Sequence, residues 1–289
     1  MLLVLALGVC LADGKPDASE VIGLVSIADG EPFTIVRRDN LLSGSKGVML
    51  LPEDIVATGA GGFVVISTPG GNLLAIGPST EVCLLQHAEL TTVRVLKGWA
   101  KADVSTRVAR IEGRRLAIQA HKAVVLLHAD DRSDAIFDEQ GTASLLLRDD
   151  AALHGTTDAA ENQFFVREDG FDVSVQPRPS DEFVTTMPTP FRDPLPARVE
   201  LPQPVPPRLL HAVTYSDIEA WLRAPRDWRS GFTSRFRPRL KDPTFFAAVD
   251  AHLTVMPEWR DILHPPPPSA PGRRADSSDQ HPEQEHEPL

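Results

Sequence analysis

The sequence has few residues that could build a disulfide framework, and no apolar run long enough for a membrane-spanning helix. Two cysteines and one tyrosine occur among 289 residues, so a disulfide-rich fold is excluded. A transmembrane helix needs about 20 consecutive apolar residues, and we expect no transmembrane span. Acidic residues outnumber basic ones, with 40 Asp and Glu against 29 Lys and Arg, and the net charge is −11. This balance argues against general binding to polyanions, so we expect no nucleic-acid partner.

An apolar segment opens the chain. Residues 1–12, MLLVLALGVCLA, have the length of a signal-peptide core and are too short to cross a bilayer. We predict a signal peptide and a periplasmic or exported product. Two alternatives remain open, a first buried strand and a lipoprotein anchored through Cys10. If the segment is removed, Cys83 is the only cysteine left; it lies in an apolar strand, and we expect a buried, inert thiol.

Short apolar runs between glycine-bearing turns occupy residues 21–176. Their regular spacing predicts an all-β domain, and strands of this length are typical of a sandwich or roll. The expected strands are 21–27, 33–36, 54–57, 63–67, 73–76, 81–85, 92–96, 99–104, 115–119, 123–128, 134–137, 143–148, 162–167 and 171–175.

Proline placement divides the rest of the chain. Residues 177–207 hold ten prolines, too many for a helix or an interior strand, so we predict an extended strap that either packs on the β domain or acts as a plain linker. Residues 208–264 are predicted to form a small helical module, whose first helix begins at Thr214 with Asp217 completing a capping box. The polar, proline-rich segment 265–289 is predicted to be disordered.

A cluster of basic and aromatic side chains departs from the acidic balance of the chain. Seven basic residues lie between positions 221 and 241, opposed in that window by Asp227 alone. Guanidinium groups bind oxyanions in bidentate fashion and aromatic rings stack on planar faces, so the cluster is a candidate anion site. Its candidate binding residues are Trp221, Arg223, Arg226, Trp228, Arg229, Arg235, Arg237 and Arg239. Alternatively, the rings form the core of the module and the arginines its solvated rim or ion-pair partners of the β domain.

The sequence contains no motif typical of a catalytic or metal centre. Its histidines lack the i, i+4 spacing of a metal-binding face, and it contains no Gly-x-Ser-x-Gly elbow. We therefore expect no cofactor, no metal and no enzymatic activity. A hydrolase acting on envelope polymers is a third possibility that would require an acid–base pair.

Several ordered motifs in the first third of the chain point to a family. They are GLV at 23–25, Gly47, LLPEDIVATG at 50–59, GFVVI at 62–66, LLAIGPST at 73–80 and VLKGWA at 95–100. Together they make residues 21–104 resemble the FecR-like domain, a β domain of the bacterial envelope. The chain departs from the family pattern at Glu53, where a glycine is usual, at Gly70–Gly71, and around Leu126, where a Gly-Thr element is missing.

The resemblance implies an envelope sensor or scaffold domain. We therefore expect a non-enzymatic exported binding module that recognises an envelope protein or glycan through its β domain. The alternative is a FecR-type periplasmic signalling regulator that works with an outer-membrane receptor and a separate membrane partner.

Overall fold

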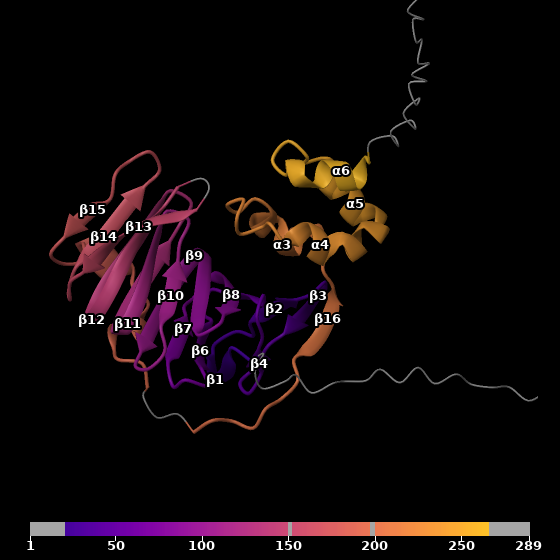
Figure 1. Cartoon of the computed structure of the whole chain (residues 1–289). Helices are drawn as coiled ribbons and strands as arrows, with labels where there is room; N and C mark the ends of the chain where they lie inside the picture. Colours follow the sequence, from indigo (N-terminus) through magenta and orange to yellow (C-terminus); the bar gives the residue numbers. More distant parts are fainter. Residues whose placement is uncertain (1–20, 150–151, 197–199, 266–289) are drawn as a thin grey trace, which may run out of the picture.

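The computed structural model describes residues 21–149, 152–196 and 200–265, so the predicted signal peptide and nearly all of the predicted disordered tail lie outside the described residues. The described part is mainly β with a small group of helices near its C-terminal end (Figure 1), which confirms the predicted fold class. Its strands form one continuous mixed sheet of sixteen. They are β1 Gly23–Asp29, β2 Thr34–Arg37, β3 Asn40–Ser43, β4 Met49–Leu50, β5 Ile55–Ala57, β6 Phe63–Ser67, β7 Leu73–Ile76, β8 Glu81–His87, β9 Leu90–Val104, β10 Ala109–Glu112, β11 Leu116–Ala129, β12 Ser133–Arg148, β13 Leu153–Ala159, β14 Phe164–Glu168, β15 Ser174–Gln176 and β16 Arg208–Ala212.

Three long strands, β9, β11 and β12, carry the sheet from one layer into a second. The first half of β9 pairs with β8 and, in parallel, with β10, whereas its second half pairs with β7 and β11. Strands β11 and β12 change partners in the same way near their midpoints. The two layers share one apolar core, to which β9 contributes Val93 and Val95 from its first half and Ala100 and Ala102 from its second.

The prediction of separate strands at these three places was wrong. In the structure each of three predicted pairs is one strand. Strand β9 joins 92–96 to 99–104, β11 joins 115–119 to 123–128, and β12 joins 134–137 to 143–148. Residues with positive φ lie at the joins, namely Gly98 at +92°, Lys122 at +54° and Gly141 at +99°. Such residues mark β-bulges as well as turns, and here the register of β11 on β12 shifts beside Lys122 while pairing continues.

Both outer faces of the two layers are also buried. One carries Val36, Ile55, Cys83 and Leu96, which pack with the C-terminal helices. The other carries Phe63, Val65, Ala75 and Trp99 together with side chains from the segment that follows β15. Strands buried on both faces read as continuous apolar runs instead of alternating ones, which explains runs such as FVVI at 63–66.

The segment after β15 packs on the second outer face and contains two short helices. These are α1 Asp181–Thr186, capped by Ser180, and α2 Thr189–Arg192. The prediction of a strap without helices was therefore wrong, because the prolines here lie at or before the helix starts, where no amide donor is needed. Phe183 and Phe191 are buried against the sheet, so this part of the strap is docked.

The C-terminal helices cover the first outer face (Figure 1). They comprise α3 Tyr215–Leu222, α4 Phe232–Phe236, the 3₁₀ turn η2 Arg237–Lys241, α5 Pro243–Asp250, the 3₁₀ turn η3 Pro257–Trp259 and α6 Arg260–Leu263. The start of α3 is as predicted, because Asp217 Oδ2 accepts a hydrogen bond from the Thr214 amide at 2.7 Å. Residues 208–212, which the sequence placed in this module, instead form β16 beside β3.

Candidate functional site

Both tryptophans of the predicted binding cluster are buried. Trp221 and Trp228 are 1% and 4% exposed and belong to the core between the helices and the sheet. The indole of Trp228 also lies against two guanidinium groups of the sheet, 5.5 Å from Arg94 and 5.3 Å from Arg148. The rings of Trp221 and Trp228 therefore pack inside the protein and do not form an exposed stacking surface.

Four of the predicted arginines are held by contacts within the protein. Arg235 donates to the carbonyl oxygens of Val36, Arg38 and Glu53, at 2.8, 3.0 and 2.7 Å, and so ties α4 to β2 and to the loop before β5. The other three are Arg223, paired with Glu219 at 2.7 Å, Arg229, paired with Glu258 at 2.9 Å, and Arg239, paired with Asp242 at 2.9 Å.

Arg226 and Arg237 differ from these four. Both are exposed, and neither has a hydrogen bond or ion pair with any residue in the described part of the chain. Arg226 lines a pocket of about 490 Å³ that Arg237 does not reach. The structure therefore separates the predicted cluster into buried rings, arginines engaged inside the protein, and two exposed arginines.

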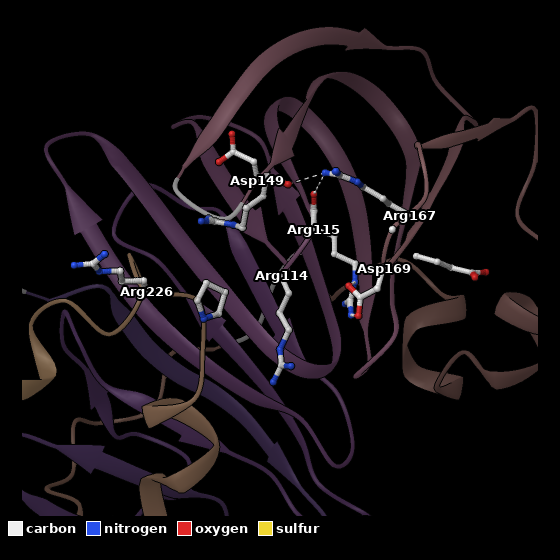
Figure 2. A pocket seen from close by; sticks show the side chains of 10 residues that line it. Arg114, Arg115, Asp149, Arg167, Asp169 and Arg226 are labelled. Carbon is white, nitrogen blue, oxygen red and sulfur yellow. Dashed lines mark hydrogen bonds and ion pairs between the residues drawn. The ribbon is translucent and has the colours of Figure 1, made fainter. Parts of the chain in front are cut away.

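The pocket beside Arg226 lies where the helical module meets one end of the sheet (Figure 2). Four segments form it: the turn between β10 and β11, the end of β12, the end of β14 with its following turn, and the loop after α3. The lining residues are Arg114, Arg115, Arg148, Asp149, Arg167, Glu168, Asp169, Gly170, Pro225 and Arg226. Five of the ten are arginines, which is unusual in a chain of net charge −11.

Arg115 is the best-anchored side chain of this pocket. Its Nε and Nη2 form a bidentate pair with Asp169 at 2.6 and 2.8 Å, and its Nη1 lies 3.4 Å from Asp134 Oδ1. The hydrogen bonds from Arg115 lower the pKa of Asp169. Burial raises the pKa of Asp134 despite its contacts with Arg115 and two backbone amides. Arg115 therefore fixes the turn after β14 to the turn before β11.

Arg148 and Arg167 also line this pocket and are held by contacts within the protein. Arg148 is paired through Nη2 with Glu112 at 2.9 Å and through Nη1 with Asp227 at 2.6 Å. Arg167 donates from Nη1 to the carbonyl oxygens of Arg115 and Arg148, at 3.1 and 2.7 Å (Figure 2). These bonds hold the guanidinium of Arg167 in place without neutralising its charge.

Sequence reasoning found Arg226 but missed the other four arginines of this pocket. Arg114 and Arg115 are adjacent, but Arg148 follows Arg115 by 33 positions and Arg167 follows Arg148 by a further 19 (148 − 115 = 33; 167 − 148 = 19). No local pattern links them. The Arg114–Arg115 doublet beside a predicted strand was the one signal available.

The open edge of the sheet at β16 is a second candidate surface. β16 pairs with β3 on one side and has no strand partner on the other among the described residues. The exposed large apolar side chains of this segment are Leu201 at 58%, Val205 at 38%, Leu209 at 61% and Leu210 at 40%. They account for half of the eight exposed large apolar residues in the described part of the chain. A groove of about 920 Å³ lies elsewhere, between β2 and β3, the loop before β5 and the region of α4, and no residue of β16 lines it.

The described residues contain no group of three or more His, Cys, Asp and Glu side chains that could hold a metal ion. Cys83 is buried, and burial raises the pKa of its thiol to about 12 even though Arg235 and Arg94 are nearby. A thiol with this pKa stays protonated at neutral pH and is a poor nucleophile. Within the described ranges, no helix combines the length and apolar character that crossing a bilayer requires.

Comparisons with known proteins do not assign this chain to a family. No protein-family model and no curated protein matches it. Two crystal structures, both described as a "putative anti-sigma factor" from Parabacteroides distasonis, are 12% identical to it in sequence with a TM-score of 0.38. Each match covers 45% of this chain and 62% of the other chain, so the chain spans less than two thirds of those proteins.

Proposed function

We propose that this chain is a non-enzymatic, exported binding module of the bacterial cell envelope, and that it recognises an extended segment of an envelope protein along the β16 edge. The observation that carries the proposal is the group of exposed leucine and valine side chains on β16 and in the segment just before it, next to an outer edge of β16 that has no strand partner among the described residues. Exposed apolar patches on soluble proteins mark interaction sites. Open strand edges accept further strands unless charge, proline or cover protects them.

The chemistry of this edge favours a protein partner over a glycan. Its exposed side chains are aliphatic, and aliphatic groups lack the flat ring faces that stack on sugars. Proline at 202, 204, 206 and 207 removes backbone donors before β16, so strand addition is confined to Arg208–Ala212. Leu201 and Val205 would then add apolar contacts beside the paired strand.

A FecR-type signalling regulator is the second candidate, and the backbone at Glu53 favours it. Glu53 has φ of +68°, a conformation that glycine adopts without steric cost. It occupies the position where the FecR-like pattern usually has glycine, so the loop before β5 keeps the backbone geometry of that pattern. Under this proposal the segment bound at β16 would belong to an outer-membrane receptor.

Site-directed photo-cross-linking in intact cells tests the binding role. A photoreactive residue at position 209 should give a discrete cross-linked product, and the same residue at exposed Phe171 near β15 serves as the matched control. Adding Leu201→Lys should weaken the product at 209. Identical products at 209 and 171, unaffected by Leu201→Lys, would contradict the proposal.

Mass spectrometry of the cross-linked partner then separates the two candidates. An outer-membrane receptor segment favours the regulator, and another envelope protein favours the general binding module. Intact mass of the mature chain tests export independently: a periplasmic product that begins near Asp13 is expected, whereas an uncleaved cytoplasmic chain would contradict export.

A further inference from the structure

We propose that two copies of this chain pair through the β15 edge of the sheet, in an antiparallel arrangement with a twofold axis at Val175. The main path of the sheet begins at β15 and ends at β16, and β15 has no strand partner on its outer side among the described residues (Figure 1). This segment carries two exposed apolar side chains, Phe171 at 67% and Val175 at 55%. It is separate from the β16 edge, so the inference goes beyond the proposed function and stands without it.

The pairing of β12, β14 and β15 shows which backbone groups face the open edge. Along an antiparallel pair, residues that bond the partner strand alternate with residues whose backbone groups point away from it. The Asp169 amide donates to the Arg132 carbonyl at 3.0 Å, and the alternation carries this direction to Phe165, whose backbone groups also face β12. Val175 lies opposite Phe165 in the register of β15 on β14. The N–H and C=O of Val175 therefore point away from β14, toward the open edge.

Val175 suits a twofold axis, whereas its neighbours along this edge do not. The axis places a residue opposite its own copy, and Val175 can both donate to and accept from Val175 of the second copy. The same alternation turns Val173 and Pro177 outward, so the Val173 amide would donate to the Pro177 carbonyl of the second copy. An axis at Pro177 is excluded because proline has no amide donor. An axis at Val173 would require an extended strand through Gly170, which lies in a turn with φ of +78°.

The charges that flank β15 match across such an axis. An axis at 175 places position 172 of one copy opposite position 178 of the other (172 + 178 = 175 + 175). Asp172 and Arg178 are both exposed, and neither side chain has a hydrogen bond or ion pair with a residue in the described part of the chain. Opposite charges that face each other across paired strands stabilise the pairing, and like charges destabilise it. The axis forms this ion pair twice, so the segment is complementary to itself.

The side chain of Val175 supplies the apolar part of the interface. Residues directly opposite in an antiparallel pair share a face, and Phe165, opposite Val175, belongs to the core between the two layers. Val173 also packs against that core. Pairing of two copies would continue this core from one copy into the other and cover Val175, with Phe171 adding apolar surface at each end. A contact this small predicts a weak dimer, with a Kd of about 10–100 μM.

Pairing at β15 leaves the β16 edge of each copy free. The dimer would therefore present two β16 edges. Attachment at two sites raises the apparent affinity for any partner that carries two suitable segments.

Two charge-reversal variants of the full chain, studied apart and mixed by sedimentation velocity, test the proposal. Arg178→Asp makes positions 172 and 178 acidic in both copies, and Asp172→Arg makes them basic, so each variant alone should self-associate at least about tenfold more weakly than the unaltered chain. Mixed in equal amounts, the two variants restore opposite charges at both contacts and should form a heterodimer with the affinity of the unaltered chain. Arg237→Asp is the matched control, since Arg237 is exposed and unpaired within the described residues but lies far from β15 in the sequence. Its dimer should be unaffected.

Val175→Lys tests the position of the axis, because it sets two like charges opposite each other, and it should also abolish the dimer. Val255→Lys, at an exposed apolar position of the helical module, should not. In intact cells, a photoreactive residue at position 171 should give a homodimer, whose mass of twice the chain separates it from a product at 209 that contains another protein. An unaltered chain that stays monomeric at about 100 μM, a dimer that persists in Arg178→Asp and Val175→Lys, or mixed charge variants that do not associate would overturn the proposal.

Discussion

The Nη1 of Arg148 donates a hydrogen bond to Oδ2 of Asp227 over 2.6 Å, joining the end of β12 to the loop after α3 across 79 positions of sequence. The Nη2 of the same guanidinium reaches Glu112 at 2.9 Å, and both side chains of that pair are nearly inaccessible to solvent. Trp228, next to Asp227, packs against Arg148 and Arg94. The helical module is therefore attached to the sheet by a buried charge cluster as well as by apolar contact.

Arg148→Met should lower the free energy of unfolding by about 3–5 kcal/mol, because it leaves Glu112 buried with fewer cationic partners. Urea denaturation followed by tryptophan fluorescence measures the change. Arg223→Met is the matched control, since Arg223 forms an exposed i, i+4 pair with Glu219, and its effect should stay below about 1 kcal/mol. Equal losses in the two variants would show that the buried cluster carries no special stability.

Lys101→Met should release the docked strap. The side chain of Lys101 is buried, its Nζ donates to the carbonyl oxygens of Phe191 and Asp193 at 2.9 and 3.2 Å, and it pairs with Glu139 at 2.8 Å. Its loss leaves polar groups without partners at a cost of about 1–3 kcal/mol, so limited proteolysis should cut between residues 181 and 195 faster. Lys97→Met, which removes an exposed pair with Glu81, should leave the rate of cleavage unchanged.

Glu53→Gly should stabilise the protein by about 1 kcal/mol, because relief of the positive φ exceeds the added entropy of the unfolded chain. Thermal unfolding monitored by circular dichroism would show a higher midpoint. Glu161→Gly is the control: Glu161 is exposed and its φ is not positive, so this change should destabilise. A lower midpoint for Glu53→Gly would mean that the Glu53 side chain makes a stabilising contact that outweighs the strain.

Asp138→Asn should change how stability depends on pH. Burial, with a smaller contribution from Glu161, raises the pKa of Asp138 to about 7, and neither carboxylate oxygen has a hydrogen-bond partner among the described residues. The folded state therefore holds a proton that the unfolded state releases near pH 4, so this group makes stability fall as pH rises from about 4 to about 7.

The Asp138→Asn variant should lack that fall and should be more stable than the unaltered chain at pH 8 by about 1–3 kcal/mol. Urea midpoints measured at pH 4, 6 and 8 give the comparison. Asp172→Asn, in the exposed turn after β14, should follow the profile of the unaltered chain. Parallel profiles for Asp138→Asn and the unaltered chain would contradict a raised pKa.

The sequence predicted the β architecture because each strand carries its own apolar run between turn residues. It predicted the start of α3 from Thr214 and Asp217, whose interaction is local. It failed at Gly98 and Gly141, since a glycine with positive φ serves a turn and a bulge equally well, and only the partner strand distinguishes them. The helices of the strap were missed because proline count ignores that Pro188 and Pro190 lie at the start of α2.

The candidate pocket could not be predicted because its parts meet only in the folded sheet. Arg115 reaches Asp169 across 54 positions, and Arg148 reaches Asp227 across 79. The local density of arginine around Arg235 was visible in the sequence. The contacts of Arg235 could not be predicted from the sequence, because its three hydrogen-bond acceptors are backbone carbonyls, which every residue has.

The burial of both outer faces by segments that follow most of the strands has a consequence for biosynthesis. Arg235 Nη2 bonds to the Val36 carbonyl across 199 positions, and the aromatic side chains that cover Val36, Ile55 and Leu96 lie beyond residue 214. A growing chain therefore completes most of its strands while two apolar surfaces are still uncovered. Contacts this distant in sequence form slowly, and exposed sheet surface promotes aggregation. The segments after residue 180 thus protect the earlier part of the same chain from aggregation, and ribosome-bound chains that end before residue 180 should need a chaperone in their place.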